Sequence, residues 1–185
     1  MPTTKNPTKV VTGKVRLSYV HLFEPYSSNP AEQEARYSCT ILIPKKDKAT
    51  LAKIDAAIKA AAEEGKTKKF GGRIPTNLST TLHDGDEEAD LERNPEYAGH
   101  FYMAMNSKQK PGVVDADLNP VMDATEVYSG CYARVSMGAF AFNTNGNKGV
   151  SFGLNNVQKL EDGEPLGGVR AKAEDDFADE DGDLI

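Results

Sequence analysis

The chain has 185 residues, and its 22 Lys and Arg against 28 Asp and Glu give a net charge of −6. Seven of the acids lie in residues 173–185, which contain no base, whereas residues 1–73 carry 14 bases and 7 acids. The negative total therefore reflects the C-terminal tail and does not exclude a polyanionic partner for the rest of the chain.

No apolar run in the sequence approaches the ~20 residues of a membrane-spanning helix. The N-terminal residues also lack the apolar stretch of a secretory signal. Cys39 and Cys131 are the only cysteines, too few for a disulfide framework. The composition thus predicts a protein of the reducing cytoplasm, and this length favours a single domain.

Residues 1–9 are rich in Pro, Thr and Lys and are predicted to be a flexible lead. From Val11 the chain alternates between apolar and polar residues, which predicts a half-buried strand. Val15, Leu17 and Tyr19 are expected on its inner side, with Lys14 and Arg16 pointing outward.

A loop is expected at 23–30, where two prolines interrupt the pattern, and a second strand from about 35 to 43. Asp47 is then a plausible N-cap for an alanine-rich helix over about 47–64, which Gly65 would end. A basic stretch around Phe70 follows the helix. Residues 74–97 are polar and acidic and are predicted to be a long loop, with a short helix as an option.

Strands are predicted again at 99–106 and 113–114, with a Lys-, Pro- and Gly-containing turn between them. The clearest signal is a β-hairpin formed by 132–142 and 149–159, which a loop at 143–148 would join. The small apolar side chains of its first strand are expected in the core: Ala133, Val135, Met137, Ala139 and Ala141. Alternation leaves two interpretations of the opposite face open: a second core layer, which it slightly favours, or a platform for stacking.

Residues 161–185 contain few core-forming side chains and are predicted to be a disordered acidic tail. The chain would thus consist of a lead (1–9), a folded domain (10–160) and a tail (161–185). Several short strands with one main helix predict a mainly β protein, either a small barrel or a sandwich.

The sequence offers little for catalysis. His21, His83 and His100 are far apart in the chain, and none belongs to a metal-ligand motif. The acidic run at 84–92 lacks the Gly and Glu that an EF-hand loop requires and is predicted to be a solvated loop. Cys131 is predicted to be a buried structural thiol. No catalytic residue, metal or cofactor is therefore expected, and a metal-dependent nuclease built on 84–92 is a minor alternative.

Binding of single-stranded nucleic acid is better supported, because it needs cations for phosphates and flat rings for bases. The candidate nucleic-acid-binding residues are basic or aromatic residues on predicted outward faces and loops: Lys14, Arg16, Tyr26, Phe70, Lys108, Lys110, Tyr132, Arg134, Phe140, Phe142 and Lys148.

The tail combines acids with apolar residues, which favours docking to a basic-rimmed pocket over a purely solubilising role. Its candidate partner-binding residues are Asp175, Asp176, Phe177, Asp179, Glu180, Asp181, Asp183, Leu184 and Ile185.

Several segments resemble a family of phage and prophage single-stranded DNA-binding proteins. They are FEPYSSNP (23–30), RYSCTILIPKKD (36–47), NSKQKPGVVD (106–115) and a long block over 128–168. The resemblance implies an OB-fold, a small five-stranded barrel with an added helix. It also implies sequence-tolerant binding of single-stranded DNA in phage replication or recombination, without catalysis, with the tail recruiting partner proteins.

Bacterial single-stranded DNA-binding proteins have tails that end in Pro-Phe, whereas this chain ends in Leu184-Ile185. Phage partners are therefore as plausible as host partners for the tail, and a homo-oligomer is possible. A structural or assembly module of a phage particle is the alternative function from another class.

Overall fold

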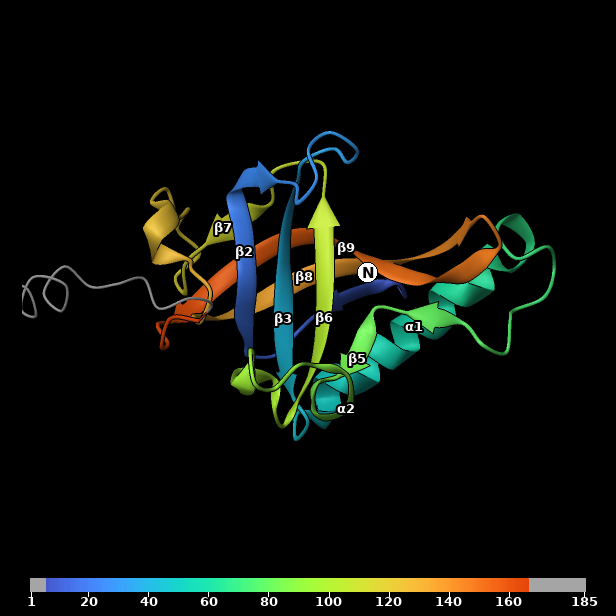
Figure 1. The fold of residues 1–185 in the computed structure, drawn as a ribbon, viewed down its shortest axis with the longest axis horizontal. Coiled ribbons are helices and arrows are strands. Elements are labelled where there is room, and N and C mark those ends of the chain that lie inside the picture. The colour runs from blue at the N-terminus through green and yellow to red at the C-terminus, as the bar shows by residue number, and fades with distance from the viewer. Residues whose placement is uncertain (1–5, 167–185) are drawn as a thin grey trace, which may run out of the picture.

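The alternating segments form nine strands in residues 6–166, the part of the chain that the computed structural model describes (Figure 1). The strands are β1 (Lys9–Val11), β2 (Val15–Tyr26), β3 (Arg36–Pro44), β4 (Ser79–Thr80), β5 (Leu82–Asp84), β6 (His100–Ser107), β7 (Gly112–Val114), β8 (Tyr132–Thr144) and β9 (Asn147–Glu161). The helices are α1 (Lys48–Lys68) and α2 (Gly85–Glu88), with short 3-10 turns η1 (Pro95–Tyr97) and η2 (Ala124–Glu126). Within these residues no helix combines the length and hydropathy that crossing a bilayer requires.

Five of the strands close into a barrel in the order β2-β3-β6-β9-β8, with β8 pairing back to β2. All neighbours in this ring are antiparallel except β6 and β9, which meet in parallel at Asn106 and Gly153. A five-stranded barrel that is nearly open at one seam is the OB architecture that the family resemblance implies. The mainly β prediction with one main helix is confirmed.

The predicted inner faces fill the barrel. Val15, Leu17, Ile41, Val135 and Met137 have no exposed surface. Helix α1 packs its own apolar stripe against β8, and Asp47 caps it by accepting a hydrogen bond from the Thr50 N–H at 3.1 Å. The alternation thus identified the core side of the main strands correctly.

Tyr19 departs from that alternation. A register shift between Ser18 and His21 interrupts the pairing of β2 with β3, and Tyr19 adopts φ 48°. The extra residue turns its ring outward, so the side chain is 55% exposed instead of buried beside Leu17. Strand β2 then continues to Tyr26, through part of the loop predicted at 23–30.

Two other boundaries differ from the prediction. The hairpin turn contains only Asn145 and Gly146, both with positive φ, so β8 and β9 pair as far as Thr144 and Asn147. Such a two-residue turn matches the twist of the strands better than the longer loop expected at 143–148. Helix α1 continues through Gly65 and ends at Lys68. Gly65 faces Ala141 of β8, and its missing side chain leaves room for that strand.

The last residues of the flexible lead predicted at 1–9 are packed in the structure. Residues 6–8 already contact the barrel: Thr8 is 8% exposed, and its carbonyl accepts a hydrogen bond from the Ala139 N–H at 2.8 Å. The acidic tail predicted for 161–185 lies outside the described residues from 167 onward.

The distal part of the hairpin, residues 139–152, extends beyond the barrel and is called the arm here. Helix α1 lies along it (Figure 1). Gly65 is the point of closest approach, because a Cβ added there would lie 2.3 Å from the Cβ of Ala141. The arm is therefore held by a glycine contact that leaves no room for a methyl group.

Gly65→Ala should destabilise the protein by about 1–3 kcal/mol, the usual cost of overpacking, despite the better helix propensity of alanine. Urea denaturation would measure the loss. The matched test is the same change in an Ala141→Gly background, where the space is restored and G65A should cost less or stabilise. An equal cost in both backgrounds would show that the contact with Ala141 is not the cause.

Candidate nucleic-acid interface

The outward surface of β2, β3 and β6, called the front face here, carries three hollows in a row. Each contains residues from all three strands, and the outward side chains of β3 form their common floor: Arg36, Ser38, Thr40, Leu42 and Pro44. In Figure 1 this face is turned toward the viewer, with the loop 27–35 above it and the start of α1 below. The hollows follow one another along β3, at Arg36 and Ser38, then at Thr40, then at Leu42 and Pro44, and this row is called the track here.

The upper hollow, of about 450 Å³, lies between Tyr26, Arg36 and Asn106, under the loop after β2. Tyr26 is 53% exposed and stacks in parallel on His21, with ring centroids 4.3 Å apart. Burial lowers the pKa of His21 below its usual 6.5, so this stacked pair is uncharged at neutral pH. Arg36 Nη1 donates to Asn106 Oδ1 at 3.1 Å, which places a cation at the rim.

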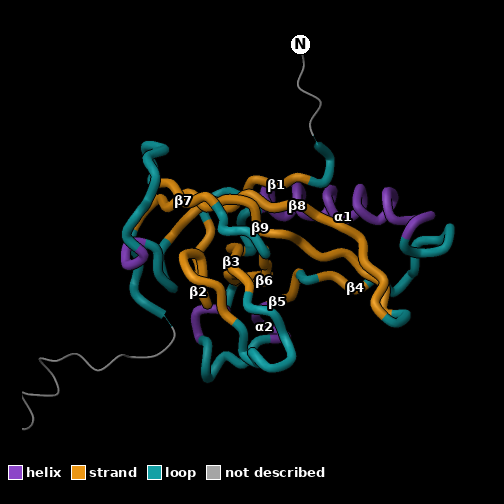
Figure 2. The backbone as a smooth tube through the Cα atoms, turned by 90° about the horizontal axis from the view of Figure 1, so that it is seen from above, coloured by secondary structure: helices purple, strands orange, loops and turns teal. Residues whose placement is uncertain are grey.

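The middle hollow is lined by the rings of Tyr19 and Tyr102, with Thr40 as its floor. Its outer wall is the segment 88–97, and Figure 2 shows α2 and the loops around it standing out from the front face. Tyr97 joins this wall to the sheet, since its hydroxyl lies 3.4 Å from Ser18 Oγ and its ring packs against Tyr102 at 5.0 Å.

The lower hollow, of about 760 Å³, is the most basic of the three. Lys14, Arg16, Lys45 and Lys46 line it, together with the ring of Tyr132. Lys14 Nζ lies 4.9 Å and the Arg16 guanidinium 5.6 Å from the centre of that ring. A cationic rim around an aromatic ring is the combination that holds a phosphate beside a stacked base.

Most of these cations already have partners. Lys14 forms an ion pair with Glu161. Arg16 donates to the backbone carbonyls of Gly130 at 3.1 Å and Glu164 at 2.6 Å, and so ties the residues after β9 to the barrel. Lys46 is exposed and makes no ion pair within residues 6–166. An arriving phosphate would therefore exchange contacts at Lys14 and Arg16 and gain a new one at Lys46.

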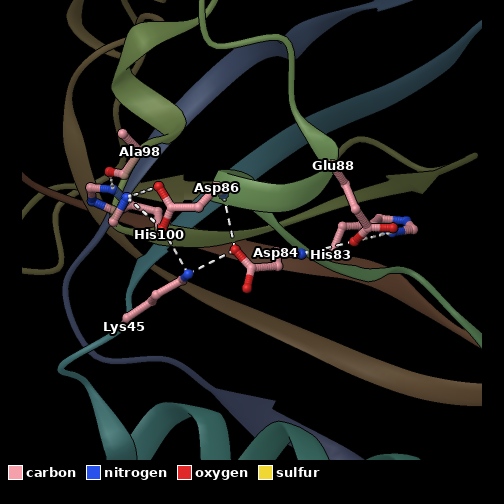
Figure 3. Close-up of polar contacts among 8 residues, drawn as sticks. Lys45, His83, Asp84, Asp86, Glu88, Ala98 and His100 are labelled. Carbon is pink, nitrogen blue, oxygen red and sulfur yellow. Dashed lines mark hydrogen bonds and ion pairs between the residues drawn. The ribbon is translucent and has the colours of Figure 1, made fainter.

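Lys45 is held more firmly, by two carboxylates from the start of the acidic segment (Figure 3). Its Nζ lies 2.7 Å from both Asp84 Oδ1 and Asp86 Oδ2, and Asp86 also accepts a hydrogen bond from the Gly99 N–H. The hydrogen bonds from Lys45 lower the pKa of both carboxyls and raise that of the lysine. This network fixes the wall of the middle hollow to the ends of β3 and β6.

The same network bears on the alternative of a metal-dependent nuclease. Lys45 occupies two of the six carboxylates that the run at 84–92 offers to a cation, Asp84 and Asp86. Residues 6–166 contain no group of three or more His, Cys, Asp or Glu side chains placed to hold a metal ion. Cys131 has no exposed surface and burial raises its pKa, as expected for a structural thiol.

A second aromatic surface lies on the arm. Phe140 is 49% exposed and Phe142 is half-buried. Both rings lie beside glycines of β9: a Cβ at Gly149 would lie 2.8 Å from Phe142, and one at Gly153 would lie 4.0 Å from Phe140. The missing side chains of β9 leave ring surface uncovered, with Lys148 close to the tip.

The structure places the other predicted residues apart from the front face or at its edge. Lys108, at the upper end, lies 3.9 Å from Glu34, and Lys110 Nζ lies 5.4 Å from the Phe23 ring centre. Arg134 is exposed beside β1 and donates to the Thr12 carbonyl at 3.0 Å. Phe70 is only 3% exposed and belongs to the hydrophobic core, so its ring is closed to a base and we remove it from the candidate set.

Sequence reasoning missed several front-face residues: Tyr19, His21, Arg36, Lys45, His100 and Tyr102. Arg36 alternated outward with Ser38 and could have been included on that signal. Tyr19 could not, because only the bulge turns it outward.

Comparisons with known proteins agree with this geometry. A family model described as Enterobacter phage Enc34, ssDNA-binding protein, matches residues 8–185. Protein p50 of Acyrthosiphon pisum secondary endosymbiont phage 1 is 29% identical over 177 residues, which cover 92% of this chain and 93% of p50.

Two solved structures share the fold. The single-stranded DNA-binding protein of bacteriophage Enc34, in complex with ssDNA, superposes with a TM-score of 0.74 at 26% identity, over 88% of this chain and 91% of the other. Bacteriophage T7 gp2.5, a single-stranded DNA binding protein, superposes with a TM-score of 0.61 over 93% of both chains. Its 15% identity makes it a comparison of fold alone.

Lys45→Met should flatten the acid dependence of stability. Asp84 and Asp86 have lowered pKa values in the folded state, so their contribution is present above about pH 4 and is lost as the pH falls through those values. Without Lys45 both values return toward normal. Urea midpoints measured from neutral pH down to about pH 3 should therefore fall less steeply in K45M than in wild type.

Lys46→Met is the matched control for this experiment, because Lys46 is an exposed neighbour without an ion pair in residues 6–166. It should keep the wild-type acid dependence. Superimposable curves for K45M and wild type would contradict the assignment.

Proposed function

The chain belongs to the family of the Enterobacter phage Enc34 ssDNA-binding protein, and from this premise we propose that it binds single-stranded DNA without reading its sequence. The observation that carries the proposal is the front face, where aromatic rings line each hollow and cations lie at the two ends of the row. Every base has a flat face, so stacking on such rings tolerates any sequence and stabilises binding by about 1–3 kcal/mol per base.

Bases would stack on the Tyr26–His21 pair, on Tyr19 and Tyr102, and on Tyr132. Phosphates would pair with the cations at the two ends of the track: Arg36 at the upper end, and Lys14, Arg16 and Lys46 at the lower end. The middle hollow offers no cation but has acidic residues in its wall, which favours a base there and disfavours a phosphate. Rings along the row and cations at its two ends would thus give the strand a defined path.

The arm would extend this surface. Phe140 offers an uncovered ring and Lys148 a cation near the tip of the hairpin. Single strands fit this arrangement better than duplexes, because in a duplex both faces of each base are already stacked on neighbouring bases.

The acidic tail supplies the rest of the proposal. Residues 173–185 would occupy the basic lower hollow when DNA is absent, and DNA would displace them. Support comes from the seven acids of the tail and from Arg16, which ties residue 164 beside that hollow. Once displaced, the tail would be free to recruit proteins of phage replication or recombination in the host cytoplasm. No catalytic step belongs to this role.

Tyr26→Ala and Phe140→Ala should each weaken binding to oligo-dT by roughly 5- to 150-fold, the equivalent of about 1–3 kcal/mol for one lost stack. Fluorescence anisotropy with labelled oligonucleotide would measure the loss. Tyr26→Phe keeps the ring and should bind as wild type does. Full binding by a folded Y26A or F140A variant would remove that residue from the interface.

Deleting residues 173–185 should tighten binding to oligo-dT at low salt, because it removes an intramolecular competitor. The gain should shrink as salt screens the tail and weakens phosphate contacts, which for single strands follow a log–log slope of about −0.7 per phosphate neutralised.

A full-length variant with the seven tail acids changed to Asn or Gln is the control for this deletion. It should bind as tightly as the truncated chain if charge is what competes. Unchanged affinity in both proteins at low salt would contradict tail competition while leaving DNA binding itself intact.

A further inference from the structure

In the segment 115–126, called the acidic loop here, Leu118 is unusual in both its backbone conformation and its exposure. Leu118 has φ 68°, a left-handed conformation that favours Gly or Asn, and its apolar side chain is 70% exposed. Met122 in the same loop is 87% exposed. Both apolar side chains therefore lie mostly in solvent and are available to a partner.

The loop presents Leu118 rigidly. The Leu118 N–H donates to the Asp115 carbonyl at 3.0 Å, and Asp115 Oδ1 accepts from the N–H groups of Asp117 and Asn119 at 2.9 Å each. The Gln158 side chain of β9 approaches the carbonyls of Asp115 and Ala116 from behind at 3.4 and 3.3 Å. These hydrogen bonds fix the turn that exposes the leucine.

The loop is also a concentrated negative charge. Residues 115–126 contain no base and four acids: Asp115, Asp117, Asp123 and Glu126. None of them forms an ion pair with any residue between 6 and 166. An anionic surface with a protruding leucine and methionine fits a basic partner that has an apolar seat.

Such a surface exists at the opposite end of the folded molecule. Residues 65–73, called the basic end here, contain no acid and four exposed cations: Lys66, Lys68, Lys69 and Arg73. No ion pair within the described residues uses them. Half-buried Ile74 and Leu78 follow them, and Asn143 Nδ2 binds the Lys69 carbonyl at 3.0 Å, which fixes this end to the tip of the arm.

Figures 1 and 2 both place the acidic loop, beside β7, at one end of the long axis and the end of α1 at the other. Two complementary patches at opposite ends cannot meet within one copy, but they can meet between copies in a head-to-tail row. A DNA strand that holds two copies side by side raises their local concentration, so a weak contact suffices.

We propose that the acidic loop of one copy docks on the basic end of the next copy along the same DNA strand, with Leu118 and Met122 seated near Ile74 and Leu78. This inference rests on the proposed function. It makes the protein a cooperative binder of long single strands, and the partner surface is the chain's own.

The test compares oligo-dT of about 16 nucleotides, the upper range for one OB-fold, with oligo-dT about four times longer. Wild type should bind the long strand at least ~10-fold more tightly per site than the short one. Leu118→Asn with Met122→Gln should remove most of this gain while binding the short strand within about twofold of wild type. Asparagine tolerates the left-handed conformation, so the fold should be preserved.

Charge reversal tests the pairing itself. D117K/E126K and K66E/K68E should each reduce the gain on the long strand, and the variant carrying all four changes, with the wild-type net charge, should recover it. K48E/K59E, with the same charge change elsewhere on α1, should keep the gain.

The outcomes separate the two proposals. No binding to the short strand would overturn the proposed function. Normal binding to the short strand overturns this inference if wild type shows no gain on the long one, if L118N/M122Q keeps the gain, or if the four-change variant fails to recover it.

Discussion

The register of the β8–β9 hairpin is the constraint on which the rest of the structure depends. At its barrel end β8 pairs with β2 and β9 meets β6, so the hairpin closes the ring; at its other end it forms the arm. Asn145 and Gly146 fix that register through a turn that needs positive φ at both positions. A slip by one residue would bring Phe140 and Phe142 inward and expose Val135 and Met137, which would empty the core and remove the arm's rings together.

Two cations of the front face already have partners that a phosphate could replace. Lys14 is paired with Glu161 and Arg16 with backbone carbonyls, and both lie over the ring of Tyr132. These partners hold the long side chains in place, which lowers the entropy that a phosphate contact would cost. Because the existing partners are exposed or neutral, a phosphate can replace them without leaving a buried charge unpaired. Lys45 differs, since two carboxylates hold it, and its contribution is to position the wall at 84–97.

Sequence patterns predicted what depends on side-chain alternation: the main strands, the helix with its Asp47 cap, and the core side of β3 and β8. They could not predict what depends on a local break in that alternation. Tyr19 reaches the front face only through a bulge, and Tyr26 pairs with His21 only because β2 continues past Pro25. Phe70 carries the same basic neighbours that made it a candidate, yet the chain after α1 folds its ring into the core. Composition identifies the residue types of an interface, whereas long-range packing decides which of them remain exposed.

The non-glycine residues of 6–166 with positive φ are Tyr19, Leu118 and Asn145, and the fold accounts for two of them. Asn145 is required by the hairpin turn, and the strain at Tyr19 accompanies a ring turned toward the proposed DNA track. Leu118 has neither justification, since the turn it occupies would form as well with asparagine, and its side chain lies in solvent. A contact with a partner would give such a position a role that the isolated chain does not. Because the matching basic and apolar surface lies at the other end of the same folded molecule, the simplest partner is another copy, and a single DNA strand is what would align the two.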